Sequence, residues 1–304
     1  MKVITLKQDV SVSEAFKSVK YLRVGVEYVV TDLFPQQVEK ELGPEIVEQR
    51  DYVPSNFYKG ESLEGRSLFC FRTGGIGDLL FIATSLRQLK KNFPSSRLAL
   101  GCDPTFSTIL DSKADGFDVV SMPLEKRFLD RYDYILFFQG IIEGNPDAEN
   151  VNAYDLIKDS FHLDKLDNPL PNVHVEDRTK KRVRSFIEKT STGKKYRVGI
   201  QVSASVLKRS VPPQLYIDFI RNLPEEYMVY LVGGKNQYDL IDRIISNLPQ
   251  QRQMCAINAS RDLPNLAQAV ALIGELDLVI GPDSSMLHVA AAHRVPLIGL
   301  YGPF

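Results

Sequence analysis

The chain has 304 residues, which is long enough for two domains of ordinary size that fold without disulfides or a structural metal. Hydrophobic residues make up 44% and charged residues 25%, and this balance excludes a disordered or fibrous chain. The formal net charge of −1 excludes an overall basic field that would attract nucleic acid or an anionic membrane. Any anion-binding site must therefore be local.

The cysteine and histidine patterns exclude further classes of protein. The 3 cysteines form no Cys-x-x-Cys pair, and the 4 histidines show no recurring metal-ligand spacing, so we expect neither a metal site nor a disulfide framework. The first residues carry charges where a secretory signal needs an apolar stretch. No apolar run approaches the roughly 18 residues of a membrane span. The sequence predicts a soluble, cytoplasmic protein with at most peripheral membrane contact.

Residues 1–66 show a mixed polar pattern with several prolines, and we treat them as an N-terminal extension of unclear role. From residue 67 onward, short apolar strands alternate with amphipathic helices, which is typical of an α/β fold whose parallel sheet is covered by helices. The first α/β domain, with its interdomain connection, is expected over 67–172. Its predicted strands are 68–72, 97–101, 119–122 and 132–139, and its predicted helices are 78–92, 105–110 and 153–162.

A second alternating series predicts another doubly wound domain over 173–304. Its predicted strands are 197–202, 228–232, 254–257, 277–280 and 295–300, and its predicted helices are 176–189, 212–223, 238–248, 263–274 and 285–292. Two such domains usually face each other across a cleft at the carboxyl ends of their strands, so we expect the function there. Because the sequence stops directly after a strand, we expect this domain to be incomplete at its C-terminus.

The first candidate motif is a glycine turn between a predicted strand and a helix. Gly75 and Gly77 allow a tight turn and the close approach of a ligand, and Asp78 follows at the helix N-terminus. A simple helix cap is the alternative role for Asp78. The turn lacks the third glycine of a dinucleotide fingerprint and the Lys-Ser/Thr pair of a phosphate-binding loop.

The second candidate motif, 281–292, is again a strand end, a glycine turn and a helix start. Asp283, Ser284 and Ser285, with the N–H groups of the first helical turn, can form a cradle for a phosphate. His288 lies one turn further along the face that Ser284 occupies. The alternatives are that Asp283 and Ser284 only cap the helix and that His288 belongs to the core.

The third candidate motif is the loop that follows the predicted strand 197–202. Ser203 and its small polar neighbours suit the oxygens of a diphosphate, and Lys208 supplies a point charge. A solvated basic loop is the alternative. Gly233, in a glycine turn after the strand 228–232, is a further candidate for contact with the same ligand.

In combination these motifs resemble a known family. The segment from Gly75 to Asp78, the helix after it and Phe93-Pro94 resemble the start of the ADP-heptose lipopolysaccharide heptosyltransferases, glycosyltransferase family 9. The segment 281–292 and the residues 295–303 resemble the nucleotide-binding signature of that family. The resemblance covers 67–304 and implies a GT-B architecture of two Rossmann-like domains. The first would hold mainly the acceptor and the second the nucleotide sugar.

The resemblance also implies an inverting, metal-independent sugar transfer without a cofactor. Asp78 would be the general base, while Lys208, Ser284, Ser285 and the helix N-terminus would stabilise the departing diphosphate beside His288. The implied partners are a nucleotide-sugar donor, with ADP expected, and a saccharide or glycolipid acceptor; no nucleic acid is expected. The chain departs from the family where Ser284-Ser285 replaces a Thr-Gly pair and where Ser210 replaces an aromatic residue.

Three alternatives remain open from the sequence. A non-catalytic relative could keep the nucleotide or carbohydrate site without turnover. A GT-B nucleotide-sugar epimerase would share the fold, although the resemblance at Gly77-Asp78 argues against it. A Rossmann oxidoreductase lacks the third fingerprint glycine and an acidic residue at the end of its second strand.

Overall fold

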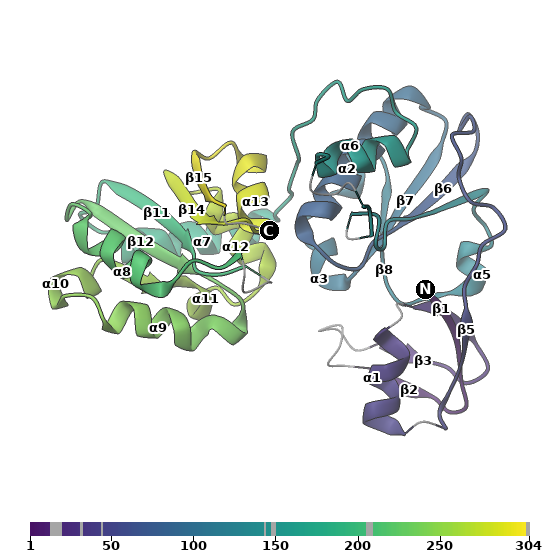
Figure 1. Cartoon of the computed structure of the whole chain (residues 1–304), viewed down its shortest axis with the longest axis horizontal. Coiled ribbons are helices and arrows are strands. Elements are labelled where there is room, and N and C mark those ends of the chain that lie inside the picture. Colours follow the sequence, from purple (N-terminus) through teal and green to yellow (C-terminus); the bar gives the residue numbers. More distant parts are fainter. Residues whose placement is uncertain are drawn as a thin grey trace. The chain divides into compact units, whose positions relative to one another are not determined.

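The computed structural model describes residues 1–12, 20–30, 33–43, 45–142, 144–146, 150–204 and 209–301. The chain divides into two compact units, Met1–Pro169 and Leu170–Phe304, and each is described by itself (Figure 1). Within the described ranges, no helix has both the length and the apolar character needed to cross a bilayer.

Unit 1 is built on a parallel sheet with strand order β10-β6-β7-β8. Its strands are β6 (Ser67–Phe71), β7 (Arg97–Cys102), β8 (Asp118–Ser121) and β10 (Tyr134–Phe137). Helix α2 (Ile76–Asn92) follows β6 directly and packs against α6 (Ala153–Ser160). Short helices α3 (Pro104–Ser107), α4 (Ser112–Asp115) and α5 (Lys126–Leu129) complete this part.

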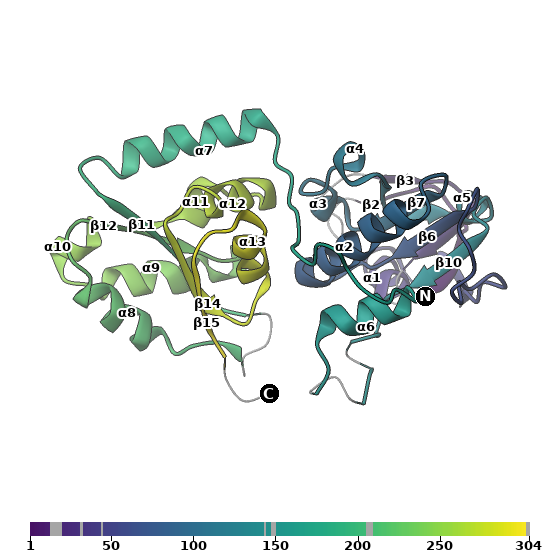
Figure 2. The ribbon, with the colours of Figure 1, turned by 90° about the horizontal axis from the view of Figure 1, so that it is seen from above.

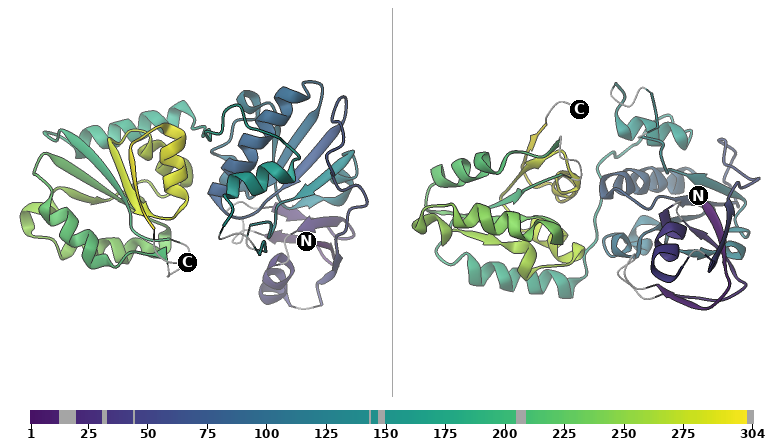
Figure 3. Two further views of the ribbon diagram at one scale, coloured as in Figure 1. Left: turned by 45° about the horizontal axis from the view of Figure 1, so that its top comes forward. Right: turned by 60° about the horizontal axis from the view of Figure 1, so that its bottom comes forward.

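Three strands from the N-terminal part of the chain and one later strand form a second, antiparallel sheet with the order β5-β1-β4-β9. Its strands are β1 (Lys2–Leu6), β4 (Glu27–Val30), β5 (Val47–Asp51) and β9 (Leu124–Glu125), the last contributed from beyond β8. Strands β2 (Val10–Val12) and β3 (Lys20–Leu22) pair separately, and α1 (Leu33–Leu42) follows β4. Figure 3 shows α1 lying against the four-stranded sheet that contains β5.

The alternation of side chains along a strand lets this small sheet pack on both faces. Ile4 of β1 joins a cluster with Phe34 of α1, whereas the adjacent Val3 joins a cluster with Phe69 and Phe71 of β6. The N-terminal residues are therefore a structural layer on the parallel sheet of unit 1, and they belong to the same unit. The polar sequence pattern of 1–66 did not indicate this role.

Unit 2 is a parallel sheet with the order β13-β12-β11-β14-β15. Its strands are β11 (Tyr196–Gln201), β12 (Tyr227–Val232), β13 (Ala256–Asn258), β14 (Leu278–Pro282) and β15 (Leu297–Leu300). In Figure 2, α7 (Asp177–Thr190) and α12 (Leu266–Ile273) cover one face, and α8 (Pro213–Asn222) and α9 (Tyr238–Ser246) cover the other. Helix α13 (Ser285–His293) packs against α12, and short helices α10 (Gln250–Gln253) and α11 (Ala259–Asp262) flank β13.

The helix predicted over 263–274 is wrong at its N-terminus. The structure has α11 ending at Asp262 and α12 beginning at Leu266. The reason is a capping box, in which Asn265 and Gln268 each bond the backbone of the other and fix the helix start.

Candidate functional site

Asp78 lies in the first turn of α2, and the glycine turn at 72–75 joins this helix to the carboxyl end of β6. Gly75 is the N-cap residue, so Asp78 is not the simple cap that the sequence left open. The Oδ2 atom of Asp78 accepts a hydrogen bond from Nη2 of Arg72 at 2.5 Å. The Asp78 side chain is 22% exposed and that of Arg72 is 4% exposed, so a carboxylate at the surface is held by a buried cation.

The two candidate glycines beside Asp78 have different local roles. Gly75 adopts a φ of +72°, and a Cβ there would come within 2.3 Å of Asp78 Oδ2. Both the backbone and the available space therefore require glycine at this position. Gly77 is buried in the first turn of α2.

In unit 2, the carboxyl ends of β11 and β14 lie side by side because these strands pair in parallel, with Ile200 opposite Ile280. Ser203 follows β11, and Ser284 follows β14. The Oγ atoms of both serines are buried, and neither has a hydrogen-bond partner among the described residues. A buried hydroxyl without a partner is costly, so this pair marks a place where an acceptor group can bind.

Ser284 is the N-cap residue of α13, and yet its side chain makes no capping hydrogen bond. The serine therefore occupies the cap position and leaves its hydroxyl for another acceptor. Ser285 begins this nine-residue helix, whose first N–H groups and positive dipole end favour an anion. His288 is partly buried one turn further on, as the sequence spacing predicted.

Asp283 has a partner that the sequence did not predict. Its Oδ2 atom accepts a hydrogen bond from Nη1 of Arg209 at 3.2 Å, which joins the loop after β11 to the loop after β14. In the same loop, Ser210 Oγ accepts from the backbone N–H of Ala204 at 3.2 Å. Lys208 lies outside the described residues, and its predicted role stays a prediction.

The glycine turn at Gly233 is closed by contacts within unit 2. Its N–H donates to Ser260 Oγ at 2.8 Å, and the next N–H, of Gly234, donates to Gln237 Oε1 at 2.7 Å. A Cβ at Gly233 would lie 2.6 Å from Gln237 Oε1. The turn therefore needs glycine for its own packing, and the contact of Gly233 with a ligand stays a prediction.

No site role was predicted from the sequence for Arg72 or Gln201. Gln201 ends β11, donates from Nε2 to Ser203 O at 2.9 Å, and has a buried Oε1 atom without a partner among the described residues. One signal was available for Arg72, since a charged residue directly after the apolar run Leu68–Phe71 stands where a parallel strand ends.

Comparison with known proteins identifies the family. Residues 151–304 match the model of "Glycosyltransferase family 9 (heptosyltransferase)", which is half of the chain. The chain therefore belongs to glycosyltransferase family 9. It is also 33% identical over 93 residues to lipopolysaccharide heptosyltransferase 2 of Escherichia coli strain K12. That match spans 30% of this chain and 26% of the relative, so the chain covers about a quarter of the relative's length.

Two solved structures share the fold over most of the chain. The glycosyl transferase family 9 structure from Veillonella parvula has a TM-score of 0.65 at 14% identity, and the match covers 81% of this chain and 83% of the Veillonella chain. The E. coli ADP-heptose lps heptosyltransferase II has a TM-score of 0.58 at 19% identity, and the match covers 79% of this chain and 85% of the E. coli chain. These likenesses confirm the predicted α/β class and GT-B architecture.

Proposed function

We propose that this chain is a glycosyltransferase that moves a sugar from a nucleoside diphosphate to a saccharide or lipid-linked saccharide, with inversion and without a metal. Membership of family 9 supports the reaction class. The likeness to the E. coli ADP-heptose lps heptosyltransferase II supports ADP-heptose as donor and a lipopolysaccharide precursor as acceptor. We place the protein in the cytoplasm, where contact with a membrane would be peripheral.

The observation that carries the proposal is the pair of buried hydroxyls at Ser203 and Ser284, neither of which has a hydrogen-bond partner in the part of the chain that the structure describes. The oxygens of a diphosphate accept hydrogen bonds, and these hydroxyls can donate them from two adjacent strand ends. The N-terminus of α13 adds positive potential, and Lys208 would add a full charge. Together these groups would stabilise the negative charge that grows on the leaving diphosphate.

Asp78 has the chemistry of the general base in such a transfer. The acceptor hydroxyl gives its proton to the Asp78 carboxylate, and its oxygen bonds to the anomeric carbon of the donor. The bond from that carbon to the diphosphate oxygen breaks with its electron pair, so the nucleoside diphosphate leaves as an anion. Attack opposite to the leaving group inverts the anomeric configuration.

Calorimetry with ADP, UDP and GDP tests the donor site. We expect one nucleotide to bind, and Ser203→Ala and Ser284→Ala each to weaken it about tenfold or more through a lost hydrogen bond to a charged group. Ser246→Ala is the matched control, because its hydroxyl bonds Arg243 O at the far end of α9. Unchanged affinity in both site variants would reject the proposed cradle.

Transfer assays with the same protein test the reaction. Asp78→Asn should lower the rate by about 10²- to 10⁴-fold, the range for a general base, and leave nucleotide affinity unchanged. Transfer should also persist in EDTA. A wild-type protein that binds the nucleotide and transfers no sugar to any acceptor tested would instead support a non-catalytic binding protein.

A further inference from the structure

The Arg72 side chain is a buried cation at the point where β6 ends and the glycine turn begins. The residue is 3% exposed, and its backbone N–H continues the sheet by donating to Gly101 O at 3.1 Å. A guanidinium in such a place must be matched by acceptors, because an unmatched buried charge is very costly. The identity of those acceptors shows what Arg72 stabilises.

Among the described residues, the guanidinium contacts the glycine turn, the end of β10 and helix α2 of unit 1. Its Nε donates to Gly74 O at 3.1 Å in the glycine turn, and its Nη1 donates to Phe138 O at 2.7 Å just after β10. Its Nη2 donates to Asp78 Oδ2 at 2.5 Å in α2. The planar fork of arginine can serve acceptors in three directions, which the ammonium group of lysine serves less well. One side chain thus ties the turn, the strand end and the carboxylate together.

The Asp78 carboxylate is bounded on a second side by the backbone. The absence of a side chain at Gly75 leaves the space that Oδ2 occupies. The carboxylate oxygen therefore fits between the Gly75 backbone and the Arg72 guanidinium. A general base works only when its carboxylate is held within hydrogen-bond reach of the substrate proton.

We propose that Arg72 is a positioning residue that fixes the Asp78 carboxylate, in its ionised form and in one orientation, for proton transfer from the acceptor hydroxyl. This inference rests on the proposed function, in which Asp78 is the base. Arg72 is buried, so it acts on the acceptor through the Asp78 carboxylate that its guanidinium holds. The effect of removing Arg72 should therefore depend on whether Asp78 can still act as a base.

A double-mutant cycle with transfer kinetics tests this dependence. Arg72→Met should lower kcat about 100-fold with nucleotide affinity unchanged. The kcat of Arg72→Lys should be about tenfold higher than that of Arg72→Met, because lysine restores the positive charge. In the Asp78→Asn background, Arg72→Met should change the residual rate by no more than about threefold. A merely structural arginine would lower the rate by the same factor in both backgrounds.

The matched control is Arg87→Met. Arg87 lies on the same helix, α2, and its Nη1 pairs with the buried carboxylate of Asp115 at 3.2 Å. Loss of this ion pair should lower the thermal stability of the protein and leave kcat per folded molecule unchanged. If Arg72→Met does not fold, the cycle is run with Arg72→Lys, whose smaller fall in kcat should likewise disappear in the Asp78→Asn background.

The outcomes separate the two proposals. If Asp78→Asn retains full transfer, the proposed base is wrong, and the positioning role falls with it. If Asp78→Asn loses transfer while Arg72→Met keeps kcat within threefold of wild type, the base stands and the positioning role is rejected. Equal rate losses from the Arg72 variants in both backgrounds also reject it.

Discussion

At the residue scale, the start of α2 depends on a glycine backbone and a carboxylate that share one small space. Gly75 has a left-handed φ of +72°, which costs an L-residue about 1–2 kcal/mol. A methyl group there would also displace Oδ2 of Asp78, which lies 2.3 Å from the ideal Cβ position. Position 75 therefore requires glycine for two reasons, its backbone conformation and the space that the Asp78 side chain occupies.

Gly75→Ala should consequently lower activity by more than its effect on stability explains. We expect a loss of about 1–2 kcal/mol in the free energy of unfolding and a fall in the transfer rate of the remaining folded protein. Gly74→Ala is the matched control, since the structure gives Gly74 no positive φ and its Cβ would meet no described atom within 4 Å. Urea unfolding and initial rates measure the two effects. Equal rates for the two variants would show that the carboxylate tolerates displacement.

The hydroxyl at Ser284 shows what a sequence can and cannot predict at this scale. Asn152 and Asn265 cap their helices by accepting a backbone N–H, each at 2.9 Å, whereas Ser284 stands at the same kind of position without doing so. All three are good N-cap residue types, so the motif was visible in the sequence, but the choice between cap and ligand group was not. That choice depends on the side-chain orientation set by packing.

At the element scale, the parallel sheets were predictable from residue 67 onward because each buried strand is an apolar run, such as Leu68–Phe71. The N-terminal sheet was not, for a physical reason. In β5 (Val47–Asp51) only Val47 is buried, and the other residues are exposed and mostly charged. Such a strand forms by antiparallel pairing with β1, and pairing between distant segments leaves no periodic signal in the strand's own sequence.

Strands β6 and β10 are joined at their starts by a cluster around Asp133. The Oδ2 atom of Asp133 accepts from the Ser67 N–H at 2.8 Å and from the Ser67 hydroxyl at 2.7 Å, and Arg66 donates to Oδ1 at 3.1 Å. These hydrogen bonds, the Ser67 hydroxyl foremost, lower the pKa of Asp133. An aspartate with a lowered pKa in the folded state stabilises that state only while it is ionised.

Asp133→Asn should therefore destabilise unit 1 in a pH-dependent way. At pH 7 we expect a loss of about 1–2 kcal/mol from weakened hydrogen bonds to a charged group. The stabilisation by Asp133 is complete above about 3.9, the pKa of an aspartate in the unfolded chain. It is lost as the pH falls through the lower pKa that Asp133 has in the folded protein. The difference between variant and wild type in urea unfolding should thus stay constant from pH 7 to about pH 5 and shrink below about pH 4.

Asp130→Asn is the control for that measurement. Asp130 pairs with Lys126 on the surface, one helical turn away, and its side chain is 52% exposed. Such pairs contribute about 0.5 kcal/mol or less. A loss for Asp133→Asn that is equally small, or that stays constant with pH, would contradict the role assigned to the cluster.

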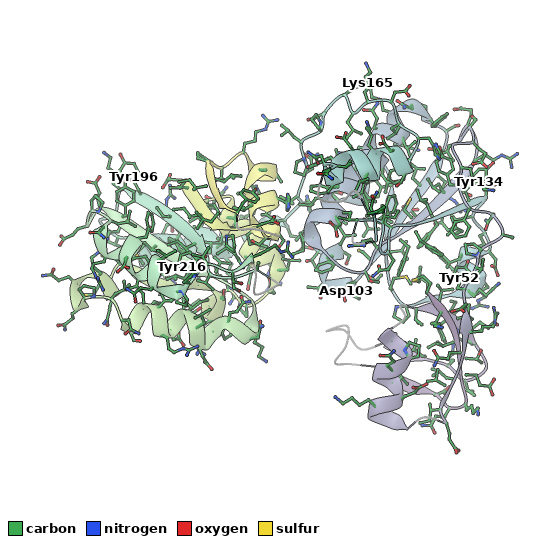
Figure 4. The ribbon with its side chains drawn as sticks, in the orientation of Figure 1. Tyr52, Asp103, Tyr134, Lys165, Tyr196 and Tyr216 are labelled. Carbon is green, nitrogen blue, oxygen red and sulfur yellow. The ribbon has the colours of Figure 1, made fainter. Side chains whose placement is uncertain are left out.

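At the scale of the whole molecule, the two units have separate cores. Among the described residues, one cluster around Val198 and Ile280 lies within unit 2, and two clusters around Ile4 and around Phe69 lie within unit 1. Residues 164–176, which span the boundary of the two units in the sequence, form neither helix nor strand, and the side chain of Lys165 in this connection is 81% exposed (Figure 4). Asp167 in the connection is held by Lys91 and Gln88 of α2. Each unit should therefore unfold as its own cooperative element.

Calorimetric unfolding with and without nucleotide uses this independence to locate the donor site. Asp133→Asn should lower the unfolding temperature of unit 1, and the calorimetric transition that it shifts is therefore the transition of unit 1. A nucleotide that binds the folded cradle of Ser203 and Ser284 should stabilise only the unit that unfolds in the other transition. The free energy of unfolding should rise by about 2.7 kcal/mol when the nucleotide concentration is 100 times Kd. Ser284→Ala should reduce that rise while the unit 1 transition stays in place. A nucleotide-induced rise in the transition that Asp133→Asn lowers would instead put the donor site in unit 1, and the roles proposed for the two units would have to be exchanged.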